Sequence, residues 1–339
     1  MSYPRPAGKL PKDSALAWFE TLEERRLLTV AINGGFLIVQ GTPSDDKLII
    51  SLDPHDSNTL VVDDNADDST IGKSYRFDIH QLSLDITGIY LIGDSGSDLL
   101  QIDESNGPIR FASYIDGGSG DDTLVGGWGS DQLIGGDGDD SILGGAGNDH
   151  ISGGIGDDTI DGGAGSDYIY GNDGEDYLTG SGGHDFIDGG IGDDNIDGGF
   201  GDDYIIGGDG NDLLFGDAGN DTIDAGLGDD QCWGENGNDL ILGGDGDDDL
   251  VGGVGNDSLI GGRGDDLLSG NAGNDQLDAG AGTDDSIYGG AGRDTFVVGR
   301  ADRYKIQDLQ KNWDVIGKMT FSNGRKLSDF LIKSMYSKP

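Results

Sequence analysis

The 339-residue chain has one cysteine, seven prolines and no long apolar run. A single cysteine excludes an intramolecular disulfide and any cluster of thiolate metal ligands. No run approaches the roughly 18 apolar residues that a membrane-spanning helix needs. The longest apolar patch near the N-terminus, Ala15–Phe19, is too short for the core of a secretory signal. We therefore expect neither disulfide bonds nor a transmembrane segment.

Basic residues are also scarce, at 20 Lys and Arg against 65 Asp and Glu, so the net charge is −45. This charge excludes nucleic acid and anionic membranes as general partners and favours cationic ones. Most of it lies between Gly117 and Val297, where 42 acidic residues accompany only Arg263 and Arg293. Composition alone would predict a disordered chain.

A nine-residue repeat argues against that prediction. From Gly117 to Val297 the chain contains 20 consecutive units, of which the nineteenth has ten residues; the first reads GGSGDDTLV and the third GGDGDDSIL. The fourth position is Gly and the sixth Asp in all 20 units, and the eighth is Leu or Ile in 18. The exceptions at the eighth position are Cys232 and Phe296. A disordered chain does not hold three positions this tightly.

This consensus, Gly-Gly-x-Gly-x-Asp-x-apolar-x, resembles the calcium-binding nonapeptide repeat of the RTX, or hemolysin-type, proteins. The resemblance implies an all-β fold, a right-handed parallel β-roll in which adjacent turns hold Ca²⁺. It also implies a secreted or cell-surface protein, exported by a type I system through an uncleaved C-terminal signal. In the family, the Asp at position six binds the ions together with carbonyl groups of the turns. The residues at that position here are Asp122, Asp131, Asp140, Asp149, Asp158, Asp167, Asp176, Asp185, Asp194, Asp203, Asp212, Asp221, Asp230, Asp239, Asp248, Asp257, Asp266, Asp275, Asp284 and Asp294.

Physical reasoning leads to the same architecture. Positions seven to nine alternate out-in-out as a short strand, and the six preceding residues turn the chain. Two units make one coil, and stacked coils form two parallel sheets that enclose the eighth residues. This core is thin, so another interaction must stabilise the fold. Calcium binds six to eight oxygen ligands in flexible geometry, and the 20 units give 18 pairs of stacked turns. Eighteen Ca²⁺ ions would contribute +36 against the net −40 of the repeats.

Other metals fit less well. Magnesium demands octahedral geometry and dehydrates reluctantly. Zinc prefers His or Cys, but His150 and His184 fall at different positions of different units, so we interpret both as solvated. Some units deviate from the consensus, and the insertion near Asp284 is expected to break the stacking frame. Sites at the deviant turns are expected to be weaker or empty.

The sequence predicts four segments. Residues 1–28 are a disordered or targeting segment with a short helix at Ala15–Arg26, and Leu22–Thr29 reads LEERRLLT, which resembles a motif near the N-termini of bacterial secreted and surface proteins. Residues 29–116 form an all-β cap that runs into the roll, with a β-sandwich as the alternative. This cap contains a stray repeat unit, Gly93–Gln101, with Gly96, Asp98 and Leu100 in place.

The roll itself occupies residues 117–297, and residues 298–339 form a C-terminal cap. Within that last segment Ile306–Ile316 resembles the degenerate cap that closes many RTX arrays. Leu327–Tyr336 is compatible with an amphipathic helix of a secretion signal.

No catalytic motif is present in the sequence, so we expect a calcium-binding protein rather than an enzyme. The alternative function is a calcium-dependent adhesin or glycan-binding protein, with a polysaccharide or cell-surface component as its partner. Outward-facing Tyr168, Phe186 and Tyr204 should form a ladder on one face, and Phe215 and Trp233 on the other. Such ladders either stack on sugars or stabilise the sheet by cross-strand packing.

Overall fold

A computed structural model describes residues 29–33, 35–64, 73–78, 86–282, 284–297, 305–306 and 315–316. This part of the chain contains strands and no helix, and therefore no helix that could cross a membrane. The helices predicted at Ala15–Arg26 and Leu327–Tyr336 lie outside the described residues.

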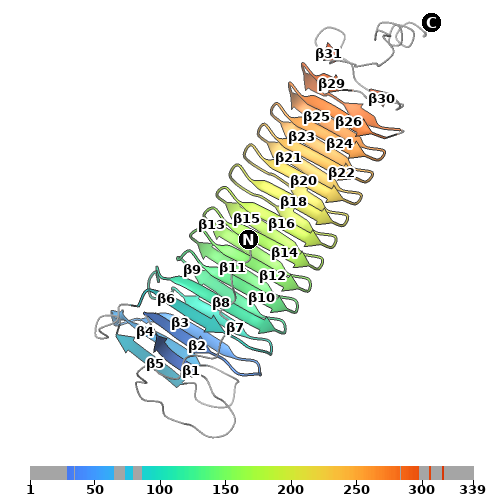
Figure 1. The fold of residues 1–339 in the computed structure, drawn as a ribbon. Helices are drawn as coiled ribbons and strands as arrows, with labels where there is room; N and C mark the ends of the chain where they lie inside the picture. The colour runs from blue at the N-terminus through green and yellow to red at the C-terminus, as the bar shows by residue number, and fades with distance from the viewer. Residues whose placement is uncertain are drawn as a thin grey trace, which may run out of the picture.

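The strands form two sheets that face each other along an elongated solenoid (Figure 1). Among the described residues, the first sheet has 15 strands in the order β1 (Thr29–Asn33), β2 (Phe36–Gln40), β6 (Gly88–Ile92), β8 (Ala112–Ser119), β10 (Gln132–Asp137), β12 (His150–Ile155), β14 (Tyr168–Asp173), β16 (Phe186–Ile191), β18 (Tyr204–Asp209), β20 (Thr222–Leu227), β22 (Leu240–Asp245), β24 (Ser258–Arg263), β26 (Gln276–Ala281), β29 (Thr295–Val297) and β31 (Val315–Ile316).

The second sheet has 16 strands over the same described residues. Their order is β30 (Lys305–Ile306), β27 (Ser286–Tyr288), β25 (Leu267–Gly273), β23 (Asp249–Val254), β21 (Gln231–Asn236), β19 (Leu213–Phe215), β17 (Asn195–Asp197), β15 (Tyr177–Gly182), β13 (Thr159–Ala164), β11 (Ser141–Ala146), β9 (Thr123–Gly127), β7 (Leu99–Asp103), β3 (Lys47–Asp53), β4 (Asp56–Asp64) and β5 (Lys73–Asp78), with β28 (Ala291–Gly292) beside β25.

The parallel register confirms the predicted coil of two nonamers. Strand β10 pairs with β12 so that Leu133 lies beside Ile151, and β11 pairs with β13 so that Ile142 lies beside Ile160. Each offset is 18 residues, which is twice the repeat. Position eight therefore forms one column in each sheet, and the two columns face each other across the interior.

Position eight supplies the core of the roll, as predicted. From Leu124 to Phe296 these side chains are at most 2% exposed, and Cys232 is fully buried among them. The thiol of Cys232 replaces a Leu or Ile between Leu214 and Leu250 of the adjacent strands. Cysteine can do so because a free thiol packs as a small hydrophobe.

The strands are longer than predicted. Most comprise six residues, because pairing with the neighbouring coils continues through positions two and three of the next unit, as in Gln132–Asp137. Backbone groups beyond the apolar side chain still pair with the neighbouring coil; the N–H of Gly120 donates to the carbonyl of Asp137 at 2.7 Å. Only positions four to six form the turn.

The N-terminal cap continues both sheets of the roll. Strands β2 and β6 extend the first sheet in parallel, and β3 and β7 extend the second. Beyond them, β1 pairs with β2 and β4 with β3 and β5 in antiparallel fashion. The described strands therefore follow the expectation of a cap that runs into the roll rather than the β-sandwich alternative.

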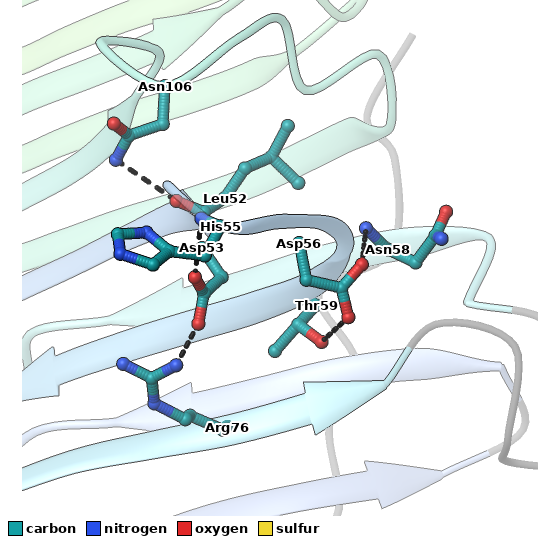
Figure 2. Close-up of polar contacts among 8 residues, drawn as sticks. All are labelled: Leu52, Asp53, His55, Asp56, Asn58, Thr59, Arg76 and Asn106. Atoms are coloured by element: carbon teal, nitrogen blue, oxygen red, sulfur yellow. Dashed lines mark hydrogen bonds and ion pairs between the residues drawn. The ribbon is translucent and has the colours of Figure 1, made fainter.

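Polar contacts fix the β3–β4 hairpin of this cap (Figure 2). The buried carboxylate of Asp53 pairs with Arg76 of β5 and accepts a hydrogen bond from the backbone N–H of His55. The amide of Asn106 donates to the carbonyl of Leu52 at 3.0 Å. This last contact joins the hairpin to the loop that leads into the roll.

Candidate metal centre

A buried aspartate occupies the end of every turn in the roll. Each of these side chains is at most 3% exposed. The carboxylates form two columns, one along each edge of the solenoid. The first column contains Asp122, Asp140, Asp158, Asp176, Asp194, Asp212, Asp230, Asp248, Asp266 and Asp285, and the second Asp131, Asp149, Asp167, Asp185, Asp203, Asp221, Asp239, Asp257, Asp275 and Asp294.

One oxygen of each carboxylate is held by the preceding coil. Oδ1 of Asp194 accepts a hydrogen bond from the backbone N–H of Asp176 at 2.8 Å, and Oδ1 of Asp212 accepts one from Asp194 at 2.8 Å. The same bond recurs along both columns at 2.6 to 3.2 Å. These bonds fix the rotation of every carboxylate, so all of them present the second oxygen in the same way.

That second oxygen, Oδ2, is buried and has no hydrogen-bond partner among the described residues in each of the first 18 units, from Asp122 to Asp275. An isolated buried carboxylate costs several kcal/mol. Eighteen of them in stacked columns would destabilise the fold severely unless a cation compensates their charge.

The surroundings of Oδ2 are rich in backbone oxygen. A Cβ added to Gly171 would lie within 3 Å of Asp176 Oδ2 and of the carbonyl oxygen of Gly189 in the next coil. Gly189 repeats this arrangement with Asp194 Oδ2 and the carbonyl of Gly207. Glycine at position one therefore keeps a small space open between a carboxylate and a carbonyl of successive coils.

Burial raises the pKa of these carboxyl groups. The pKa of Asp140, Asp158 and Asp194 rises to about 7, first through desolvation and then through the charges of neighbouring Asp residues. Asp212 and Asp230 shift to about 6 in pKa for the same leading reason. The backbone N–H bond to Oδ1 opposes the shift. A bound cation would oppose this rise in pKa, because its charge would stabilise the ionised form.

The donor set fits calcium. No group of three or more His, Cys, Asp or Glu side chains converges within the described part of the chain, so a cation here would rely on backbone carbonyls for most of its ligands. All-oxygen sites of this kind suit Ca²⁺ better than Zn²⁺. The ring Nδ1 of exposed His184 accepts from the N–H of Asp202, and half-buried His150 lies against Tyr168 and Tyr170. Neither histidine belongs to a column.

The nineteenth unit requires a correction to the predicted residue set. Asp284 is exposed, and its backbone N–H donates to Asp265 in the row of position-five side chains. Asp285 instead occupies the buried position in the first column, and its Oδ1 accepts a hydrogen bond from the backbone N–H of Asp266 at 3.1 Å.

The predicted break in the stacking frame is also wrong. Strand β27 still pairs with β25, now with an offset of 19 residues between Leu267 and Ser286. The extra residue is accommodated in the turn, which leaves the strand register intact.

Sequence reasoning also left out Asp98. This residue is 2% exposed, and its Oδ2 is buried without a hydrogen-bond partner, as in the roll. The signal was present in the stray unit Gly93–Gln101, but the six extra residues between Asp98 and Asp122 interrupt the repeat period.

The aromatic ladders lie where the sequence placed them. Tyr168, Phe186 and Tyr204 are register neighbours on the first sheet, and Phe215 and Trp233 on the second. Phe186 and Tyr204 stack with ring centroids 5.7 Å apart and planes at 4°, and Phe215 and Trp233 stack at 4.9 Å and 13°. These ring faces therefore meet neighbouring rings, which is the cross-strand packing arrangement.

Comparison with known proteins agrees with this geometry. Residues 111–302, more than half of the chain, match the RTX calcium-binding nonapeptide repeat in a series of adjoining segments. The chain therefore belongs to this family, and its repeats are calcium-binding repeats that fold as a parallel β-roll. No curated protein matches the chain.

Proposed function

We propose that the roll binds a column of Ca²⁺ ions along each edge and that these ions are required for its folding. The ligands are the buried aspartates of the two columns, with Asp285 in place of Asp284, together with carbonyl groups of adjacent turns. The observation that carries the proposal is the unpartnered Oδ2 at each of 18 successive turns. Eighteen pairs of stacked turns correspond to about 18 ions per chain.

Folding and metal binding are coupled in this proposal. The core contributes one apolar side chain per nine residues, and without cations the 42 acidic residues of the repeats repel one another. The binding energy of each ion then becomes folding energy. A chain made where free Ca²⁺ is scarce stays expanded and folds where Ca²⁺ is plentiful.

This coupling supports a secreted or cell-surface protein exported in the unfolded state by a type I system. The four segments defined above, with residues 298–339 carrying the export signal, belong to the same proposal. A structural, non-catalytic role follows from the chemistry of the columns, because their carboxylates serve as ion ligands rather than as an acid–base pair. The glycan-binding alternative gains no support from the aromatic ladders, whose ring faces stack on one another.

The decisive experiment combines native mass spectrometry with circular dichroism of the full chain. Above about pH 7, we expect the chain to lack a compact β-rich roll in chelator and to fold on addition of Ca²⁺ with about 18 ions bound. Asp194→Asn should lower the ion count and raise the Ca²⁺ concentration needed for folding. Asp224→Asn on the outer face of β20 is the matched control and should change neither. Fewer than about six ions, or a compact β-rich roll in chelator above about pH 7, where the column carboxylates are ionised, would refute the proposal.

A further inference from the structure

The nonapeptide-repeat match begins at residue 111, yet the first aspartate column continues past it into the cap. Backbone N–H groups and carboxylates link Asp46, Asp98 and Asp122 in the same order as in the roll. The N–H of Asp98 donates to Asp122 Oδ1 at 2.7 Å, and the N–H of Asp46 donates to Asp98 Oδ1 at 2.6 Å. These bonds join residues 24 and 52 positions apart in sequence, whereas the spacing within the roll is 18.

The space beside Asp98 repeats the space beside Asp122. A Cβ on Gly93 would overlap both Asp98 Oδ2 and the carbonyl oxygen of Gly117, just as a Cβ on Gly117 would overlap Asp122 Oδ2 and lie 2.7 Å from the carbonyl of Gly135. The turn also keeps the backbone of the repeat: Asp94, at position two, has φ of 93°, and Gly96, at position four, has φ of 117°. The Asp98 side chain is buried at 2% exposure, and its Oδ2 has no partner.

The next coil toward the N-terminus differs in one respect. There a Cβ on Gly41 would lie 2.7 Å from both Asp46 Oδ2 and the carbonyl oxygen of Gly93. However, Asp46 Oδ2 accepts hydrogen bonds from the backbone N–H of Thr42 at 2.6 Å and from its hydroxyl at 3.0 Å. Thr42 thus supplies to Asp46 Oδ2 the hydrogen bonds that Asp98 Oδ2 does not receive from the described residues.

We propose that Asp98 and the carbonyl of Gly117 form an additional Ca²⁺ site that ties the N-terminal cap to the roll, and that Thr42 ends the column at Asp46. This inference rests on the proposed function, because it assumes that unpartnered Oδ2 groups in the columns mark ion sites. It extends the column by one ion beyond the repeats, to about 19 ions in total. The cap strands β3 and β7 flank this site in the second sheet, so their stability depends on Ca²⁺.

The test uses the full chain and three substitutions that preserve shape. Asp98→Asn keeps an oxygen that can accept from Asp46 but removes the charge. Asp45→Asn alters an exposed acid one residue before Asp46 and serves as the matched control. Asp194→Asn reports on the roll. Native mass spectrometry counts bound Ca²⁺, and hydrogen exchange followed by mass spectrometry reports on the protection of individual strands.

We expect Asp98→Asn to bind one Ca²⁺ fewer than the parent chain at saturation. Amides of β3 and β7 should exchange at least about tenfold faster than in the parent, because the site beside them is lost, while those of β20 and β22 remain protected. At saturating Ca²⁺, Asp45→Asn should match the parent in both measurements, because Asn keeps the oxygen that accepts from the N–H of Ser97. If Asp98→Asn retains the full ion count and the parent's exchange rates while Asp194→Asn loses ions, the cap site does not exist and the proposed function stands. If Asp194→Asn also retains its ions, the proposed function itself is wrong.

Discussion

Two adjacent glycines allow a sharp test of how closely the coils approach each other. Gly183 occupies position four, where φ is 154° and an added Cβ would collide with the carbonyl oxygen of Gly165 in the preceding coil. Gly182 occupies position three, where φ lies outside the left-handed region and a Cβ would meet no atom within 4 Å. Larger residues already occupy position three in the flanking coils on the same edge, at Ala164 and Phe200. The same Gly→Ala change should therefore have opposite consequences at neighbouring residues.

The expected loss of stability in Gly183→Ala has two sources, the backbone conformation at residue 183 and the separation of the two coils. Alanine in place of Gly183 would adopt a backbone conformation that L-residues rarely occupy, at a cost of about 1 to 3 kcal/mol. Relieving the collision also requires the two coils to separate, which breaks the 2.9 Å bond from the N–H of Gly165 to the carbonyl of Gly182. Leaving these half-buried groups unpaired adds about 1 kcal/mol. We expect Gly183→Ala to destabilise the Ca²⁺-loaded roll by about 2 to 4 kcal/mol. Gly182→Ala should be neutral or stabilising by about 0.4 to 1 kcal/mol, because it reduces the entropy of the unfolded chain.

Urea unfolding at fixed, saturating Ca²⁺, followed by far-UV circular dichroism, compares the two variants with the parent. A hydrogen-exchange map should place the loss in Gly183→Ala at the coils around residues 165 and 183. Equal shifts in the two variants would refute the reasoning, because the residues share chemistry and location and differ only in backbone conformation and in the space beyond Cα.

Three further predictions follow from individual residues. Glu235 occupies position two with φ of 68°, so Glu235→Gly should stabilise the loaded roll by about 1 kcal/mol in the same unfolding assay, and a destabilised variant would contradict the strain argument. Cys232 is fully buried and its thiol pKa is raised by desolvation, so it should resist a thiol reagent in Ca²⁺ and react in chelator; Cys232→Leu should fold normally. Because burial raises the folded-state pKa of Asp140 and Asp158 from 3.8 to about 7, protonation stabilises the metal-free roll. In chelator, circular dichroism should therefore show most β-structure below about pH 4 and a progressive loss as the pH rises through about 7, and the opposite trend would contradict the assignment.

The repeat made much of the fold predictable. Gly, Asp and an apolar residue at fixed positions of every unit favour a coil of 18 residues, because that spacing places the apolar side chains inside and the aspartates in two columns. Burial of Cys232 followed from the same frame. The six-residue length of the strands did not follow from it. The glycines at positions one and two carry no side-chain pattern, and their pairing depends on backbone groups alone.

The misassigned aspartate has a related cause. In the nineteenth unit two acidic residues are adjacent, and counting from the start of the unit selects Asp284. Pairing between coils is instead set by the strand that follows the turn. The aspartate directly before that strand, Asp285, therefore occupies the buried position, and the extra residue lies earlier in the turn. Asp98 was missed for a different reason. Its unit matches the repeat locally, but an irregular loop separates that unit from the array.

The two edges of the roll differ in charge outside the buried columns. Twenty of the 42 acidic residues of the repeats are buried, which leaves 22 at more exposed positions. Eighteen Ca²⁺ ions would bring +36 to columns that carry −20, so these outer acids are needed to balance the ions. They are concentrated on the first edge, where position five holds Asp121, Asp139, Asp157, Glu175, Asp193, Asp229, Asp247, Asp265 and Asp284. On the second edge, position five holds one acid, Asp202, among Ser, His, Arg and a run of asparagines.

This asymmetry predicts tighter ion binding on the first edge, because ligand and near-ligand charge tunes the affinity of calcium sites. Asp247 and Asn256 occupy equivalent places on the two edges, and each accepts a backbone N–H from its neighbouring coil, at 2.7 Å from Asp265 and 3.0 Å from Asn274. Asp247→Asn should raise the Ca²⁺ concentration for half-saturation and Asn256→Asp should lower it, each by about two- to fivefold for an exposed charge. Hydrogen exchange during a Ca²⁺ titration should show the turn at 245–248 becoming protected at lower Ca²⁺ than the turn at 254–257. Weaker binding by Asn256→Asp, or simultaneous protection of the two turns, would mean that the outer acids do not set the affinity of the columns.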